Sequence, residues 1–189
     1  VDAGRMPGVL DRVTAAFPRT LDGPGAPPAP PPPVPPGSPV SPAELTAAVF
    51  GAFDPVHGGF GTDAKHPLVA PLRLALERAD ADPASRAILE ATLDAMGWGG
   101  LYDEADGGFF RCAETRDWRQ PRTEKMLEAN AQLLRLYLDA GRLLGAARFT
   151  ERAADILRYI QTWLADAVDG GWWGSQAADG QYYGDLTST

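Results

Sequence analysis

The sequence has few of the residues that hold metals or form disulfides. It contains one cysteine and two histidines. The single cysteine, Cys112, excludes an internal disulfide, a CxxC redox pair and a multi-cysteine zinc site, so its simplest role is that of a small buried apolar group. The paired glycines do not match a dinucleotide-binding or P-loop motif, and no metal-ligand spacing is present. We therefore predict no cofactor and no metal.

Positive charge and long apolar runs are also scarce. Lys plus Arg number 17 against 25 for Asp plus Glu, which gives a net charge of −8. Without a basic run, binding to nucleic acid or to an anionic membrane is disfavoured. Charged residues interrupt every apolar stretch well short of the roughly 20 residues that a membrane-spanning helix needs. The composition predicts a soluble domain and fits a reducing, cytoplasmic location.

Proline is unevenly distributed, and this divides the chain. Of the 18 prolines, 11 fall between Pro24 and Pro42. We predict a polyproline II linker over residues 21–42, and we favour a plain spacer over an SH3 ligand because the tract lacks a flanking basic residue. Residues 1–20 hold one amphipathic helix around residues 9–17, and residues 43–189 are long enough for one core.

The apolar pattern after the linker predicts five helices. The first begins at Ser41-Pro42 with Glu44 completing a capping box, and the third begins at Asp82-Pro83. We expect the second to follow Pro71. The last two carry apolar stripes over residues 126–138 and 149–164, and we expect them to end at Gly141 and Gly170. A short β-like ribbon is expected beyond them, over residues 172–183.

A short phrase, D-x-x-x-G-G-aromatic, recurs three times between these helices. It occupies residues 54–60, 103–109 and 166–172. The spacing is that of two helices and their connections, so we predict an internal repeat of helical hairpins. The paired glycines allow tight reversals with positive φ. The aromatic residue either wedges between hairpins, which we favour, or lines a pocket for a sugar ring.

Four ordered strings carry a resemblance to a known family. They read FDPVHGGFGTDAKHP (53–67), GGLYDEADGGFFR (99–111), DWRQPRTEKMLEANAQL (117–133) and GGWWGSQAADGQYY (170–183). The region from residue 43 to 185 resembles the helical domain of the thioredoxin-domain-containing, spermatogenesis-associated protein family. Several family histidine, tyrosine and aspartate positions hold other residues here.

The resemblance implies both a fold and a domain order. The family joins an amino-terminal thioredoxin-like domain to a six-hairpin (α/α) toroid similar to N-acylglucosamine 2-epimerases. Residues 1–20 then correspond to the closing helix of the upstream domain, and residues 43–189 to a partial toroid. A complete toroid needs on the order of 300 residues. The fold predicted is therefore all-α, with αα-hairpins forming an incomplete (α/α)6 toroid whose apolar flank is completed by further residues or by self-association.

Two carboxyl groups are the leading candidates for catalysis, and Asp103 is a third. Glycoside hydrolysis uses two carboxyl groups roughly 5 to 10 Å apart, and Glu124 and Asp179 lie in family-like strings. An acid in a first helical turn is also favoured by the helix dipole alone, so Glu124 has a purely structural alternative. Epimerisation needs a group that moves a proton from carbon, for which His57 and His66 are the available histidines. Both lie in the first repeated loop, where they either share a pocket or, as we favour, are surface loop residues.

Six further residues are candidates for ligand binding. The basic ones suit an anionic or hydroxyl-rich ligand but could instead pair with nearby aspartates, which an acidic chain favours. Trp118 could stack on a sugar or pack against a hairpin loop. The six are Lys65, Asp103, Arg111, Trp118, Lys125 and Asn130. The leading hypothesis is a carbohydrate-processing or carbohydrate-binding domain; the alternatives are an inactive helical interaction module and a redox function in an upstream domain.

Overall fold

The protein is described by a computed structural model that covers residues 41–178 and 182–186. The predicted helix near residues 9–17, most of the proline-rich segment and Asp179 lie outside the described residues.

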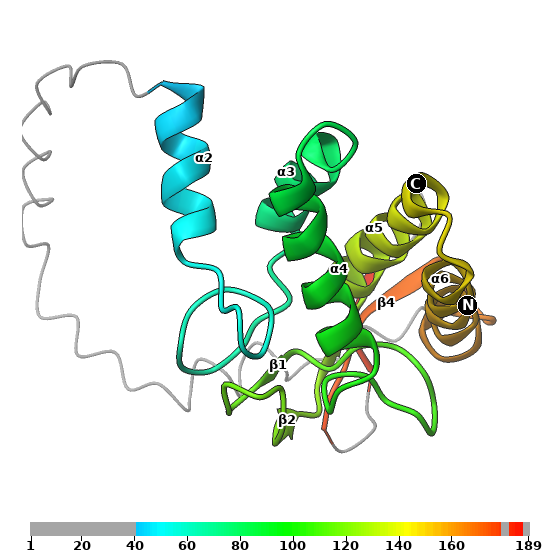
Figure 1. Cartoon of the computed structure of the whole chain (residues 1–189). Helices are drawn as coiled ribbons and strands as arrows, with labels where there is room; N and C mark the ends of the chain where they lie inside the picture. The colour runs from blue at the N-terminus through cyan, green and yellow to red at the C-terminus, as the bar shows by residue number, and fades with distance from the viewer. Residues whose placement is uncertain (1–40, 179–181, 187–189) are drawn as a thin grey trace, which may run out of the picture. The chain divides into compact units, whose positions relative to one another are not determined.

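Five α-helices and one π-helical segment form the described helical part (Figure 1). In chain order they are α2 (Pro42–Gly51), α3 (Val69–Arg78), α4 (Pro83–Gly97), α5 (Leu127–Leu144), α6 (Ala147–Tyr159) and η1 (Ile160–Leu164). Helices α3 and α4 form one hairpin and α5 and α6 a second, and α3 lies beside α5. This arrangement is the predicted repeat of αα-hairpins.

The predicted helix starts at residues 42 and 83 are confirmed. The Ser41 backbone N–H donates to Glu44 Oε2 at 2.8 Å while the Glu44 N–H donates to Ser41 Oγ at 3.1 Å, so the capping box is complete. Asp82 Oδ1 accepts from the Ala84 N–H at 3.1 Å. These caps satisfy amide groups that have no partner within the helix.

The second helix starts earlier than predicted. Helix α3 begins at Val69, so Pro71 lies in its first turn and does not precede it. Proline is tolerated there because the amide groups of the first turn have no intrahelical acceptor.

The predicted ends of the last two helices are wrong. Helix α5 continues through Gly141 to a left-handed C-cap at Gly145. Gly141 is buried where α6 crosses, and a Cβ there would overlap the Thr150 side chain, so it serves close helix packing. Helix α6 runs into η1, which ends at Leu164, and Gly170 lies in the loop beyond. A glycine at the end of an apolar stripe therefore did not mark the helix end in either case.

The core lies between the two hairpins and the loops that join them. It is built from aliphatic side chains of α3, α4, α5 and α6 together with a group of rings in contact. Phe109 stacks on Tyr137 with ring centroids 5.5 Å apart, and Phe149 meets the same tyrosine edge-on at 5.9 Å. Fully buried members include Leu72, Leu89, Leu93, Met96, Leu133, Leu136, Phe149 and Ile156.

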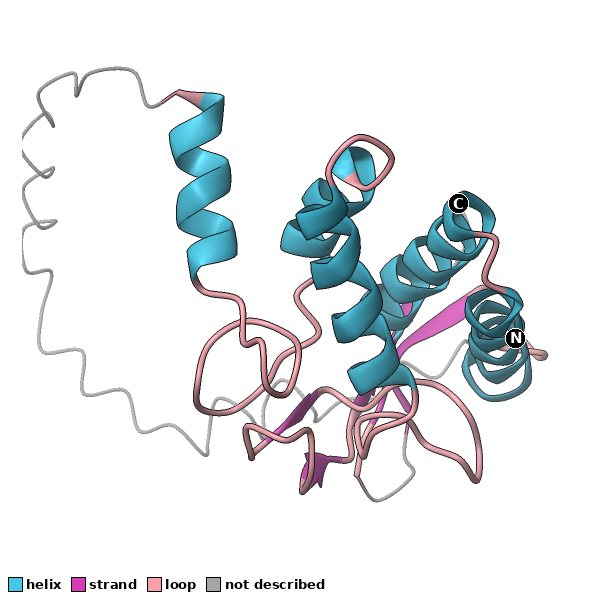
Figure 2. Cartoon of the chain, in the orientation of Figure 1, coloured by secondary structure: helices cyan, strands magenta, loops and turns pink. Residues whose placement is uncertain are grey.

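Short strands tie the hairpins together at one end of the helices (Figure 2). Strands β1 (Cys112–Ala113) and β2 (Pro121–Arg122) pair antiparallel, and β3 (Lys125–Met126), β4 (Trp172–Gln176) and β5 (Tyr182–Leu186) form a second antiparallel sheet in that order. The predicted ribbon near residues 172–183 is confirmed as β4 and β5. Strand β3 joins it because the segment before α5 runs alongside β4. We call this end of the helices the loop end.

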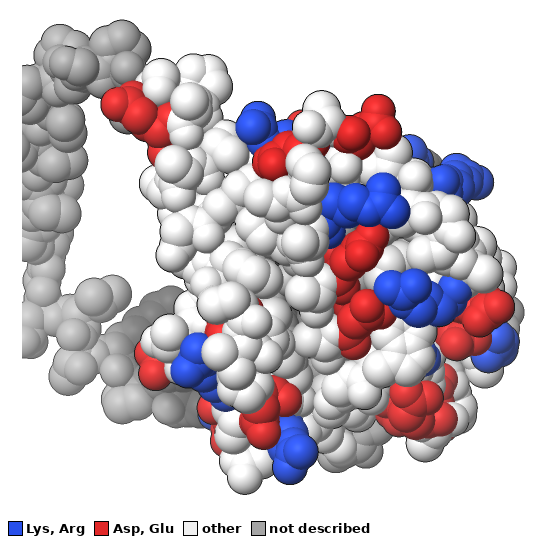
Figure 3. Space-filling model, viewed as in Figure 1, with Lys and Arg blue, Asp and Glu red and all other residues white. Residues whose placement is uncertain are grey.

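Acidic and basic side chains are interspersed on the face seen in Figure 3. Several form ion pairs, including Arg148 with Asp94 at 2.9 Å and Arg86 with Glu90 at 3.0 Å. None of the helices in the described part combines the length and the apolarity needed to cross a membrane. Helix α2 buries none of its residues, and its apolar Leu45 is 58% exposed.

Candidate functional site

The three repeated phrases fold into the same loop. We call residues 54–60, 103–109 and 166–172 the first, second and third glycine loops. In each, the aspartate N–H donates to the carbonyl of the second glycine, at 2.8, 3.0 and 3.1 Å respectively. The aspartate Oδ1 also accepts the backbone N–H groups two and three residues further on. Every glycine of the three pairs has positive φ, as predicted.

A buried lysine holds the first glycine loop. Lys65 Nζ donates to Asp54 Oδ2 at 2.9 Å and to the Gly61 carbonyl at 2.6 Å. Arg116 approaches the same carboxylate from another loop, with Nε 2.7 Å from Oδ2. Hydrogen bonds from Arg116 and Lys65 outweigh burial and hold the pKa of Asp54 well below its usual range.

A second lysine holds the second glycine loop in the same manner. Lys125 Nζ donates to Asp103 Oδ2 at 2.6 Å and to the Gly107 carbonyl at 2.7 Å. The ammonium group also lies 4.5 Å from the centroid of the Tyr159 ring. Burial alone would raise the pKa of Asp103, but the hydrogen bonds from Lys125 and from the backbone prevail and lower it. The ion pairing that an acidic chain favours is thus present for both lysines.

Asn130 and Trp118 also support the loops. Asn130 Oδ1 accepts the Phe109 N–H at 2.7 Å and its Nδ2 donates to the Phe109 carbonyl at 3.0 Å, so one side chain satisfies both backbone groups of a loop residue. The buried Trp118 ring packs on Gly59, and its Nε1 donates to the His57 carbonyl at 2.8 Å. Trp118 therefore packs against a hairpin loop, the alternative to stacking on a sugar.

The predicted ligand residues thus divide into two groups. Lys65, Trp118, Lys125 and Asn130 are buried and hold the glycine loops. Arg111 is exposed, and Asp103 is partly exposed beside Lys125. A direct ligand role for the buried four stays a prediction, while Arg111 is free to meet a ligand without a rearrangement of the loops.

Of the predicted catalytic pair, Glu124 and Asp179, the structure describes only Glu124. Glu124 is half-buried just before β3, and its carbonyl accepts the Arg111 N–H at 2.8 Å. Within the described residues its Oε2 is enclosed without a hydrogen-bond partner. Because Asp179 lies outside the described residues, its distance from Glu124 and the catalytic role of the pair stay predictions.

A polar pocket of about 380 Å³ opens at the loop end. Its hydrogen-bonding side chains come from two segments of the chain, His66 before α3 and Arg111, Glu114 and Arg122 around the β1–β2 pair. Arg122 contacts Glu114 at 2.9 Å, and both side chains are at least half exposed. An ion pair this exposed contributes little stability, so both groups can exchange it for a ligand. We call this the arginine pocket.

A second pocket, of about 300 Å³, lies on the other side of the same extended segment. Phe110 faces it, whereas the next residue, Arg111, faces the arginine pocket. It brings Asp103 and Lys125 together with Gln176 of the family-like string in β4. Gln176 Oε1 accepts the Tyr159 hydroxyl at 3.0 Å. In this pocket Asp103 and Lys125 are bound to each other, and Gln176 is bound to Tyr159.

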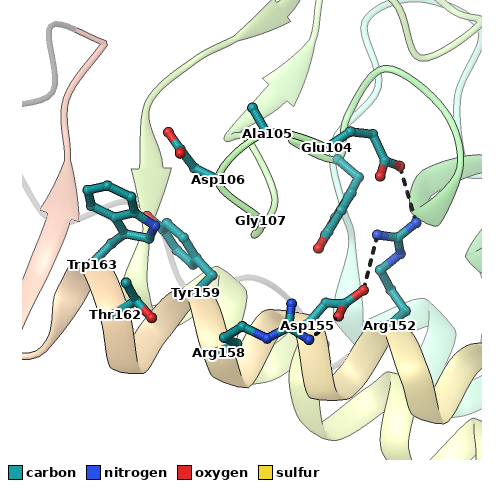
Figure 4. A pocket seen from close by; sticks show the side chains of 11 residues that line it. Glu104, Ala105, Asp106, Gly107, Arg152, Asp155, Arg158, Tyr159, Thr162 and Trp163 are labelled. Atoms are coloured by element: carbon teal, nitrogen blue, oxygen red, sulfur yellow. Dashed lines mark hydrogen bonds and ion pairs between the residues drawn. The ribbon is translucent and has the colours of Figure 1, made fainter.

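A third pocket, of about 270 Å³, lies between the second glycine loop and α6 (Figure 4). The buried Arg152 guanidinium lies 3.6 Å from the centroid of the Tyr102 ring and pairs with Glu104 at 3.2 Å and with Asp155 at 3.6 Å. This network joins the second glycine loop to α6, the second helix of the hairpin that follows the loop. In the described part of the chain, no cluster of three or more His, Cys, Asp or Glu side chains is placed to hold a metal.

The sequence prediction missed Arg116, Arg122 and Arg152. Arg116 lies 62 residues from its partner Asp54, and Arg152 lies 48 residues from Glu104. Residues this far apart in the sequence form ion pairs without any short motif that would predict the contact. Arg122 carried a signal, because it stands where the resembled family has a histidine at the loop end.

Known proteins with the same fold include several sugar-active enzymes. The cellobiose 2-epimerase from Spirochaeta thermophila superposes with a TM-score of 0.61 at 22% identity, over 76% of this chain and 40% of that one. An α-mannanase from Bacteroides thetaiotaomicron gives a TM-score of 0.55 at 13% identity, over 69% and 39% respectively. At these identities the likeness shows the fold alone. The predicted αα-hairpin fold of the (α/α)6 toroid type is confirmed.

The proteins that resemble this chain in sequence differ from the enzymes that share its fold. The chain is 33% identical over 133 residues to spermatogenesis-associated protein 20 from Rattus norvegicus, and the Homo sapiens protein gives the same figures. The match covers 67% of this chain and 17% of either relative, and it shows homology over that part. The chain thus matches about a sixth of the length of these relatives. No family model matches the chain.

Proposed function

We propose that the hairpin domain binds a hydroxyl-rich, sugar-type ligand in the arginine pocket. The observation that carries this proposal is the meeting of His66, Arg111 and Arg122 with Glu114 in one open pocket at the loop end. Guanidinium groups present several N–H donors in a fixed plane, and a carboxylate accepts, so the pocket complements vicinal hydroxyl groups. The sugar-active enzymes that share the fold support the same ligand class.

The chemistry of the pocket also predicts the strength of binding. In the described part of the chain its lining includes no tryptophan, tyrosine or phenylalanine ring on which a sugar could stack. Binding then rests on hydrogen bonds that compete with water, each with a small net free energy. We expect a Kd in the range of roughly 0.1–10 mM for a single disaccharide.

Ligand-observed NMR on the full chain tests this proposal. A panel of mono- and disaccharides, including cellobiose, is screened against the native chain and against Arg111→Ala, Arg122→Ala and Arg86→Ala. We expect saturation transfer to at least one sugar, a loss of roughly tenfold or more in affinity for each pocket variant, and no change for Arg86→Ala on α4. Absence of binding across the panel, or equal binding by all variants, would sink the proposal.

Within this proposal, Glu124 and Asp179 are the carboxyl groups that act on a bound sugar. The structural alternative from the sequence, an acid in a first helical turn, is wrong for Glu124 because α5 begins only at Leu127. Its Oε2, without a hydrogen-bond partner among the described residues, supports a role in chemistry. On the sugar that the screen identifies, Glu124→Gln and Asp179→Asn should each reduce turnover by orders of magnitude while the unfolding midpoint stays within a few degrees. Variants that change stability but leave turnover intact would assign the pair a structural role.

A non-catalytic helical interaction module is the second candidate function. It is supported by the burial of Lys65, Trp118, Lys125 and Asn130 in loop contacts, which removes them from direct ligand contact in this conformation. The two functions separate in the NMR screen, since an interaction module predicts no sugar signal with the native chain.

We also propose that the chain comprises the end of a thioredoxin-like domain (1–20), a linker (21–42) and part of a toroid (43–189). Limited proteolysis of the full chain with thermolysin tests these boundaries by mass spectrometry. A stable fragment that begins within a few residues of Ala43 is the expected product. Cleavage throughout residues 43–178 at the same rate as in the linker would contradict the division.

A further inference from the structure

The pocket between the second glycine loop and α6 combines an aromatic face with both kinds of hydrogen-bonding group. Its volume is about 270 Å³, just below the roughly 300–1,000 Å³ of pockets that hold drug-sized ligands, so it suits a ligand of one ring. The rings of Trp163 and Tyr159 lie at one end of the pocket, and Arg152 lies at the other (Figure 4). We call it the tryptophan pocket.

Trp163 belongs to η1, the π-helical segment that follows α6. Hydrogen bonds in a π-helix span five residues in place of four, so the side chains of η1 are rotated about the axis relative to a continuous α-helix. Both Thr162 and Trp163 line the pocket there, and Trp163 is 38% exposed. Single π-helical turns are rare and occur frequently at functional sites. The indole therefore offers a flat apolar face to a ligand.

The acceptors of the tryptophan pocket are three carboxylates. Asp106 lies in the second glycine loop, and no lysine or arginine of the described residues forms an ion pair with it. Glu104 is bound to Arg152 at 3.2 Å, but its side chain is 70% exposed, so water and ligands can exchange with this contact. Asp155 accepts from Arg158 at 2.6 Å. The carboxylate of Asp106 is thus available to a ligand without the loss of an ion pair.

The donors are two guanidinium groups and a hydroxyl group. The side chain of Arg152 is 7% exposed, and its Nε has no hydrogen-bond partner among the described residues. The side chain of Arg158 is 70% exposed and contacts one carboxylate in the described part of the chain, so several of its N–H groups remain for a ligand. Thr162 adds a hydroxyl group that both donates and accepts.

This mixture of donors and acceptors favours a neutral ligand. Three carboxylates against two guanidinium groups give the pocket a net charge of −1. An anion would meet the carboxylates, and a cation would meet the guanidinium groups. A hydroxyl group both donates and accepts, so it can bond to either kind of side chain. The ring carbons of a sugar also present an apolar face that can pack on an indole.

We propose that the tryptophan pocket is a second sugar site, which binds one neutral pyranose ring. The apolar face of the ring packs on Trp163, and its hydroxyl groups bond to Asp106 and Arg158. The tryptophan pocket and the arginine pocket share no lining residue in the described part of the chain. This inference goes beyond the proposed function and does not depend on sugar binding in the arginine pocket.

Fluorine NMR of the full chain labelled with 5-fluorotryptophan tests the proposal. The sequence contains five tryptophans, and the variants Trp163→Phe and Trp172→Phe assign the two signals needed. Trp172 is the matched control, because it is also 38% exposed but does not line the pocket. The probes are the methyl glycosides of glucose, mannose and galactose. We expect at least one of them to shift the Trp163 signal to saturation and to leave the Trp172 signal in place.

Two variants separate this site from the arginine pocket. Asp106→Ala should weaken the affinity read from the Trp163 signal by roughly fivefold or more, because an exposed acceptor of hydroxyl groups is lost. Arg111→Ala, in the arginine pocket, should leave that affinity unchanged. In the Arg111→Ala background, Trp163→Ala should remove the saturation transfer to the probe that remains.

Several outcomes would overturn the proposal. One is a Trp163 signal that responds to none of the three glycosides, or that shifts no more than the Trp172 signal. A second is loss of the shift in Arg111→Ala, because the change at Trp163 would then be an indirect effect of the arginine pocket. A third is a stronger response to glucuronate or to arginine methyl ester, which would assign the pocket to a charged ligand. A shift at Trp163 in a chain whose arginine pocket binds no sugar would support this site and contradict only the first.

Discussion

Lys65 Nζ lies 2.9 Å from Asp54 Oδ2, and both side chains are completely buried. The lysine belongs to the segment that leads into α3, and its backbone pairs with Ala113 beyond the second glycine loop. Lys125 repeats this arrangement, with Asp103 as its acid and Gln176 as its backbone partner beyond the third loop. Each lysine therefore closes one glycine loop and connects it to the next, which explains how short strands hold the hairpins in order.

Replacement of a loop lysine should destabilise the fold. In Lys125→Met, Asp103 loses a charged hydrogen bond at a mostly buried site, and we expect a loss of roughly 2–4 kcal/mol in the free energy of unfolding. Urea denaturation of the full chain measures it. Arg86→Met, which breaks the exposed pair with Glu90, is the matched control and should cost about 0–1 kcal/mol. Equal effects of the two variants would contradict a structural role for the pair of Lys125 and Asp103.

The lowered pKa of Asp54 predicts a dependence of stability on pH. A carboxyl whose folded pKa is depressed stabilises the protein above its unfolded pKa of about 4, and this stabilisation is lost as the pH falls below that value. The difference in unfolding free energy between the native chain and Asp54→Asn should therefore shrink from pH 7 to pH 3.5. The exposed Asp63→Asn serves as control, and a difference that stays constant with pH would refute the assignment.

Two glycines of equal backbone conformation should respond differently to alanine. Both Gly58→Ala and Gly170→Ala incur strain of about 1–2 kcal/mol from positive φ. Gly58→Ala also forces a Cβ against the Ala91 carbonyl, so it should cost roughly 1–3 kcal/mol more. Thermal or urea unfolding of both variants measures the difference. Equal losses would mean that the first loop does not rest on α4.

Loss of the Asn130 side-chain amide should lower the stability of the protein. Asn130→Ala leaves the N–H and the carbonyl of Phe109 without their buried partner, for an expected loss of roughly 2–4 kcal/mol. Gln132→Ala, two residues along α5 on the exposed side, should change stability by no more than about 0.5 kcal/mol. A stable Asn130→Ala variant that instead loses sugar binding would support the ligand role predicted from the sequence.

The sequence by itself determined the repeat and much of the secondary structure. The phrase D-x-x-x-G-G-aromatic specifies its own loop, because an aspartate can bond the N–H groups two and three residues on and glycine accepts positive φ. The caps at Ser41 and Asp82 are equally local. Such features depend on neighbours within a few residues, so they can be predicted without knowledge of the packing.

The tertiary structure decided what the polar residues do. Lys65, Lys125 and Asn130 carry side chains that suit a ligand as well as a loop, and only their burial beside Asp54, Asp103 and Phe109 separates the two roles. Arg116 forms an ion pair with Asp54, from which it is separated by 62 residues in the sequence. Gly141 lies inside α5 and does not end it, because its lack of a side chain leaves room for Thr150. These outcomes depend on how separate hairpins approach each other, which no local spacing in the sequence encodes.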